Sequence, residues 1–238
     1  MVSIINILEK RRDCVVLDHH LKWENAILSS YQEELLQYKD NPIYGIELRE
    51  DIAPPCHYHR IDHHNEGEGK PSSLEQVASV LNVQLTRYQM LVAANDKGYI
   101  PAMKALLATD EEIQMIRLQD RKAQGISEKE EIEAVKAIEN NLSRHGQLIV
   151  VKSKTSSFSP ICDRLFPFHS LLIYTDEEWM FYGDGKTELM EQLREEIMQE
   201  KVFYGGGNNG YVGSAKRAYT KENIISFVEQ MQQRYENK

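Results

Sequence analysis

The sequence has few cysteines, no long apolar run and no excess of positive charge. Its three cysteines, Cys14, Cys56 and Cys162, are odd in number and form no CxxC pair, which argues against a disulfide framework or a zinc ribbon. No stretch approaches the roughly 18 apolar residues of a membrane helix, and the N-terminal MVSIINILEKRRD reaches charge before a signal-like segment develops. The net charge of -9 argues against an extensive surface for long duplex nucleic acid. We therefore expect a cytoplasmic protein without membrane association.

The first half of the 238 residues alternates between strand and helix patterns. Strands are predicted at CVVL (14–17), IYGIEL (43–48) and HYHRI (57–61), because each is a short apolar or alternating run. WENAILSSYQEELLQY (23–38) has apolar residues at helical spacing, and SSLEQVASVL begins with serines followed by Glu75, which is typical of a helix cap. Three helical patterns follow, at 86–107, 109–124 and 127–142, and are expected to close a first domain as a small bundle.

The last hundred residues contain a second set of strands and helices. QLIVVK, SLLIYT and EWMFYG predict strands, whereas 186–199 and 221–235 have helical spacing. We therefore predict an α/β fold with two α/β domains, at residues 1–143 and 144–238, and an active-site cleft between them.

Two Asp-His-His triplets follow predicted strands, one in VVLDHH and one in HYHRIDHHNE. Side chains at the carboxyl ends of strands in an α/β sheet lie where ligands usually bind. Carboxylate and imidazole together suit manganese, zinc or iron. The alternative is that a histidine pair only caps a strand or forms hydrogen bonds within a polar loop.

A glycine-rich segment, VFYGGGNNGYVGSAK (202–216), lies near the C-terminus. Consecutive glycines allow backbone N–H groups to approach an anion, and Lys216 and Arg217 add positive charge nearby. A simple hairpin turn is the alternative interpretation.

HYHRIDHHNE resembles the signature of the DHH phosphoesterase superfamily, and the glycine-rich segment resembles that of the DHHA1-like substrate-binding domain that follows it. The superfamily includes exonucleases, oligoribonucleases, cyclic-dinucleotide phosphodiesterases and manganese-dependent pyrophosphatases. The resemblance implies a parallel-sheet domain with a helical segment, followed by a smaller mixed-sheet domain. It also implies bound Mn²⁺, with Mg²⁺ or Zn²⁺ as alternatives, and a small phosphorylated substrate or a short oligonucleotide. A homodimer is compatible with the sequence.

The resemblance also implies roles for particular residues. The catalytic residues would be His63 and His64, with His64 close to the substrate phosphate. The metal ligands would be Asp18, His20, Glu24, Asp62, His63 and Asp96. An additional acidic ligand between the triplets has three candidates, Asp40, Glu47 and Asp51. The substrate-binding residues would be His64, Gly205, Gly206, Gly207, Asn208, Lys216 and Arg217.

Two departures from the family pattern lead to alternative functions. The first motif lacks the usual pair of aspartates, and Asn208 stands where the family has a histidine. The main hypothesis is a metal-dependent hydrolase that cleaves a phosphodiester or phosphoanhydride. The alternatives are a non-catalytic sensor of a phosphorylated ligand and a single-metal protein whose histidines are structural.

Overall fold

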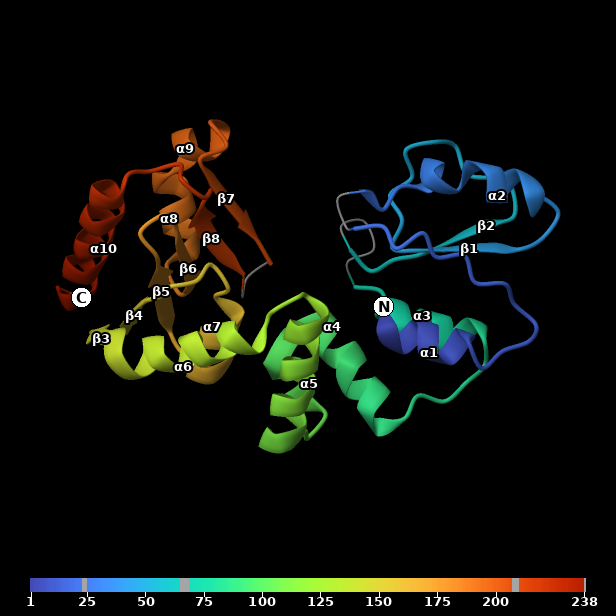
Figure 1. Ribbon diagram of the computed structural model, residues 1–238, viewed down its shortest axis with the longest axis horizontal. Helices are drawn as coiled ribbons and strands as arrows, with labels where there is room; N and C mark the ends of the chain where they lie inside the picture. Colours follow the sequence, from blue (N-terminus) through green and yellow to red (C-terminus); the bar gives the residue numbers. More distant parts are fainter. Residues whose placement is uncertain (23–24, 65–68, 207–209, 238) are drawn as a thin grey trace. The chain divides into compact units, whose positions relative to one another are not determined.

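The computed structural model (Figure 1) describes residues 1–22, 25–64, 69–206 and 210–237. It contains two compact units, Met1–Arg117 and Leu118–Lys238. Each combines helices with a sheet, so the predicted α/β class is confirmed. No helix in these residues is long and apolar enough to cross a membrane.

The first unit is organised around two parallel strands, β1 (Ile43–Ile46) and β2 (Tyr58–Ile61). Their register pairs Ile46 with Ile61, so both strands end at the same edge. The core beside them contains Ile4 of α1 (Val2–Leu8) and Leu74 and Val77 of α3 (Ser73–Val80). These helices therefore hold the strand pair from one side.

Helix α3 begins where the sequence indicated. The Ser72 hydroxyl accepts a hydrogen bond from the Glu75 N–H, and the Glu75 carboxylate accepts one from the Ser72 N–H at 2.7 Å. This capping box satisfies two backbone donors that a helix leaves unpaired at its start. The prediction of a serine cap at this position is confirmed.

The strand predicted at 14–17 is wrong. These residues have no regular secondary structure, and Val15, Val16 and Leu17 are 67%, 42% and 42% exposed. An apolar run becomes a strand only when another strand pairs with it, and none of the described strands pairs with this run.

The helix predicted over 23–38 is much shorter in the structure. It is reduced to a 3₁₀ turn, η2 (Leu28–Tyr31), and to α2 (Gln32–Gln37). Ile27 is extended and forms a parallel bridge with Arg49, and the Asp51 carboxylate accepts a hydrogen bond from the Ser29 N–H. These contacts fix residues 27–29 against residues 49–51, which prevents an earlier helix start.

The three central helices are α4 (Arg87–Ala105), α5 (Asp110–Ala123) and α6 (Glu128–Asn141). Helix α4 is kinked, because Gly98 and Tyr99 have non-helical backbone angles and Pro101 follows. The compact units divide earlier than the boundary predicted at residues 143–144, since α6 packs Ala134 and Ala137 into the core of the second unit.

The second unit is a six-stranded mixed sheet in the order β3-β4-β5-β6-β8-β7. β4 and β5 are parallel neighbours, and the other pairs of described strands in this sheet are antiparallel. The strands are β3 (Leu142–His145), β4 (Leu148–Lys152), β5 (Ser170–Tyr174), β6 (Trp179–Gly183), β7 (Val202–Gly205) and β8 (Tyr211–Ser214). The mixed sheet predicted for the C-terminal part is confirmed.

Helices cover both faces of this sheet. Along β4, Leu148 and Val150 point into one core, whereas Ile149 and Val151 point into the other. The first core is closed by α8 (Lys186–Gln192) and α10 (Lys221–Glu236), and the second by α6 and α7 (Ser159–Leu165). A short helix, α9 (Arg194–Met198), precedes β7.

Candidate metal centre

The ends of β1 and β2 bring together residues that are distant in sequence. Glu47 directly follows β1, and Asp62, His63 and His64 directly follow β2. The Glu47 N–H donates a hydrogen bond to the Ile61 carbonyl at 2.9 Å, which extends the pairing of the strands by one step. Glu47 has φ of 54°, a left-handed conformation that non-glycine residues rarely adopt and that often marks a functional site.

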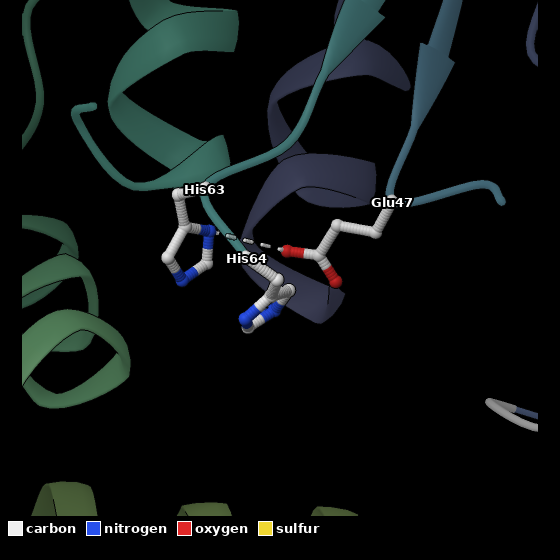
Figure 2. A group of neighbouring side chains, drawn as sticks. All are labelled: Glu47, His63 and His64. Carbon is white, nitrogen blue, oxygen red and sulfur yellow. Dashed lines mark ion pairs between the residues drawn. The ribbon is translucent and has the colours of Figure 1, made fainter. Parts of the chain in front are cut away.

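Figure 2 shows the three side chains that converge at this edge, Glu47, His63 and His64. Their ligand atoms all lie within 4.8 Å of one another, and within the described ranges no other group of three or more His, Cys, Asp or Glu does so. The Glu47 Oε1 lies 3.8 Å from the His63 Nδ1, and the two imidazole rings have centroids 4.1 Å apart. One carboxylate and two imidazoles are a set of donors that suits Mn²⁺ or Zn²⁺.

His63 is the most enclosed member of the cluster. Its residue surface is 9% exposed, and its Nδ1 lies 3.2 Å from the hydroxyl oxygen of Ser73 at the start of α3. Its Nε2 is buried and has no hydrogen-bond partner among the described atoms, although the Asp96 Oδ2 lies 3.5 Å away. A buried imidazole nitrogen without a hydrogen bond is costly unless it binds something. This nitrogen therefore fits the role of a metal ligand.

Asp96 approaches the cluster from α4, just before the kink. Its side chain is 44% exposed. Desolvation by the surrounding protein raises the pKa of Asp96 above its ordinary value, and the negative charge of Glu47 adds to this effect while His63 opposes it. Glu47 and Asp96 thus concentrate negative charge around His63, which favours a cation there.

Asp62 is buried, and protein donors hold its carboxylate. Its Oδ1 accepts a hydrogen bond from the His64 N–H at 2.9 Å, and its Oδ2 accepts one from the Arg60 Nη2 at 2.7 Å. Burial raises the pKa of Asp62, but these two hydrogen bonds outweigh burial and leave it below its ordinary value. Asp62 is therefore ionised and already paired.

The first triplet does not join this cluster. The Asp18 Oδ1 accepts a hydrogen bond from the His20 N–H at 2.7 Å, and the His20 side chain is 89% exposed. His19 stacks on Tyr31 with ring centroids 4.2 Å apart, and its Nε2 lies 2.8 Å from the Glu34 Oε1. Glu24, the third residue predicted for this motif, lies outside the described residues.

Glu47 is the candidate between the triplets that lies in the cluster. Asp51 instead accepts hydrogen bonds from the backbone and hydroxyl of Ser29. The sequence contained a partial signal for this choice, because Glu47 lies near the end of the predicted strand IYGIEL and Asp62 directly follows the predicted strand HYHRI. Two parallel strands in register place such residues side by side.

The glycine-rich segment lies at a strand end of the second unit. Gly205 ends β7, and Gly206 has φ of 73°, which glycine adopts without strain. Gly207 and Asn208 lie outside the described residues.

Lys216 and Arg217 follow the opposite end of β8. The register pairs Gly205 with Tyr211, the first residue of β8, whereas both basic side chains pair with Glu177. Lys186 lies near the described glycines, and its Nζ donates a hydrogen bond to the Gly205 carbonyl at 3.5 Å. Lys186, Tyr204 and Gly205 border a cavity of about 580 Å³, which sequence reasoning missed.

No protein-family model and no curated protein matches the sequence. Solved structures do match it, at low identity. A pGpG-specific phosphodiesterase, PggH of Vibrio cholerae, aligns over 98% of this chain and 93% of its own, with 14% identity and a TM-score of 0.46. The exonuclease RecJ bound to manganese aligns over 99% of this chain and 79% of its own, with 14% identity and a TM-score of 0.36.

A third match is a DHH domain of a protein described as a member of the s1p family of ribosomal proteins. It aligns over 67% of this chain and 45% of its own, with 13% identity and a TM-score of 0.32. The function proposed below rests on the side chains of this chain itself.

Proposed function

We propose that this protein is a metal-dependent phosphoesterase that hydrolyses a phosphodiester or phosphoanhydride in a small nucleotide, a short oligonucleotide or another phosphorylated compound. The observation that carries the proposal is the convergence of Glu47, His63 and His64 within 4.8 Å, at the carboxyl ends of two parallel strands. The buried Nε2 of His63, without a hydrogen-bond partner among the described atoms, adds to it.

Glu47, His63 and His64 would hold the metal, with Asp96 beside them. Mixed nitrogen and oxygen donors favour Mn²⁺, and Zn²⁺ or Mg²⁺ are alternatives. A divalent cation in such a site lowers the pKa of water and stabilises negative charge on phosphoryl oxygens.

The protein side chains would orient the substrate and the ligands. Ser73, whose hydroxyl oxygen lies 3.2 Å from the His63 Nδ1, would fix the orientation of that ring. His64 is more exposed than His63, so it would be the metal ligand on the side from which a substrate phosphate approaches.

Within the second unit, we propose a phosphate-binding surface of its own. The backbone of Gly205 and Gly206, together with Lys186, would contact phosphate oxygens, and the exposed Tyr204 ring offers a face on which a base can stack. The bordering cavity of about 580 Å³ has the size of an ordinary small-molecule site.

A non-catalytic sensor of a phosphorylated ligand is the second candidate. Two observations favour it: Arg60 already neutralises Asp62, and the exposed Asp18 and His20 stand apart from the cluster. Such a protein would bind metal and phosphate without turnover.

The test is hydrolysis by the purified full-length chain, stripped of metal and reloaded with Mn²⁺. We expect Mn²⁺-dependent cleavage of bis-p-nitrophenyl phosphate or of a short oligonucleotide, and loss of that cleavage in His63→Ala. Ligand-induced thermal stabilisation without turnover would support the sensor instead. Absence of activity on a broad phosphoester panel, together with absence of bound metal by elemental analysis, would reject both.

A further inference from the structure

The ion pair between Arg60 and Asp62 lies directly beside the candidate metal centre. The two residues are two positions apart, so their side chains leave the extended chain on the same face. The Arg60 Nη2 and Nε lie 2.7 Å and 3.2 Å from the Asp62 Oδ2, while the His64 N–H binds Oδ1. Asp62 is only 7% exposed. Both oxygens of a buried carboxylate are therefore held by the protein.

The charges near His63 and the charges near Asp62 are balanced in different ways. Glu47 lies 3.8 Å from its Nδ1 and Asp96 lies 3.5 Å from its Nε2, so two negative charges face this ring. A single divalent cation neutralises them. At Asp62, in contrast, the Arg60 guanidinium already supplies a positive charge at 2.7 Å, and the same guanidinium lies 4.0 Å from the Glu50 Oε1 on the Nε side.

A second divalent ion beside Asp62 would meet the guanidinium at close range. Like charges at close range in a partly buried site repel strongly, and the second ion would also displace the Arg60 hydrogen bonds to Asp62. A carboxylate that bridges two metal ions must also offer its oxygens to them.

We infer that Arg60 takes the place of a second cation beside Asp62, so that the site holds one divalent ion. Asp62 is then a positioning residue, which fixes the backbone of His64 and hence the turn that presents both imidazoles. This inference rests on the proposed metal site and specifies how many ions that site binds.

The test is the number of Mn²⁺ ions bound per chain, measured by electron paramagnetic resonance of free Mn²⁺ during titration and by elemental analysis after desalting. We expect one ion in the unaltered protein. Arg60→Gln should bind a second ion, with affinity at least about tenfold above any second binding in the unaltered chain. The double variant Arg60→Gln/Asp62→Asn should return to one ion, with affinity within about threefold of the original.

Arg144→Gln is the matched control. Arg144 is exposed on β3 in the second unit and should leave the count at one. Two ions in the unaltered protein, or a single ion in Arg60→Gln, would overturn the role of Arg60 while leaving the phosphoesterase proposal intact. Absence of any bound ion in the unaltered protein would overturn the proposed function itself.

The double variant keeps the test decisive if Arg60→Gln fails to fold. Retention of one ion with unchanged affinity in the double variant supports the inference, because it shows that the site does without the Asp62 carboxylate. Loss of that ion would show that Asp62 is a ligand and would overturn it.

Discussion

The letters Asp-His-His occur at residues 18–20 and again at 62–64. The two triplets differ in the secondary structure that precedes and follows them. The second follows a strand that pairs with a parallel neighbour, and α3 begins nine residues after its last histidine. The first follows an exposed apolar run that pairs with no strand in the described part of the chain. At the first histidine of each triplet, the His63 side chain is 6% exposed and the His19 side chain 38% exposed. A metal-binding pattern therefore depends on the scaffold that fixes it as much as on its letters.

The largest expected difference between the triplets is in metal affinity. His63→Ala should lower Mn²⁺ affinity by more than about 100-fold, because it removes an enclosed ligand that Ser73 orients. His20→Ala, the matched control in the exposed triplet, should leave affinity unchanged. Isothermal titration with Mn²⁺ measures both. An equal loss in the two variants would break the comparison.

A second difference is strand β1, which pairs with the strand before the second triplet and places Glu47 beside it. Glu47→Gln should lower Mn²⁺ affinity by roughly 10- to 100-fold, since it removes a charged donor from the cluster. Glu47→Gly should lower affinity in the same way and also stabilise the metal-free protein by about 1 kcal/mol, because it relieves the positive φ. Urea unfolding measures the second effect. Destabilisation by Glu47→Gly would show that this backbone conformation is not strained.

Asp96 should affect metal binding and stability in opposite directions. Because its pKa is raised in the folded state, the folded metal-free protein favours the protonated carboxyl, and stability falls as pH rises above the ordinary value of 3.8. Asp96→Asn should therefore raise the Tm of the metal-free protein at pH 7 while lowering Mn²⁺ affinity by roughly tenfold. Thermal unfolding at pH 3 should show no gain. A gain of equal size at both pH values would contradict the charge explanation.

The smallest expected effect concerns α3, the helix that follows the second triplet in the sequence. Ser72→Ala removes the cap of α3 and should cost about 1 kcal/mol of unfolding free energy. It should also weaken Mn²⁺ binding slightly, because α3 supplies Ser73 to His63. Ser127→Ala removes the same kind of cap from α6 in the second unit and should cost similar stability without changing Mn²⁺ binding. An equal change in binding would mean that both caps act only through global stability.

Local sequence patterns predicted most of the fold correctly. The alternating runs before Glu47 and Asp62, the serine cap at Ser72 and the helices from Thr86 onward all appear in the structure. These features depend on contacts within a few residues, which a sequence contains directly. The strand predicted at 14–17 failed because strand formation requires a distant partner, and the long helix at 23–38 failed because residues 49–51 hold its beginning.

The candidate site likewise contains residues that the local sequence predicts and residues that only the tertiary structure places there. The sequence by itself determined that His63 and His64 follow a strand, so the local pattern is enough to predict them as site residues. Only the tertiary structure decided that Glu47 stands beside them, that Asp62 is bound to Arg60, and that Lys186 accompanies Gly205. The physical reason is register: parallel pairing of β1 with β2 sets residues fifteen positions apart at one edge, and no local pattern encodes which strands pair.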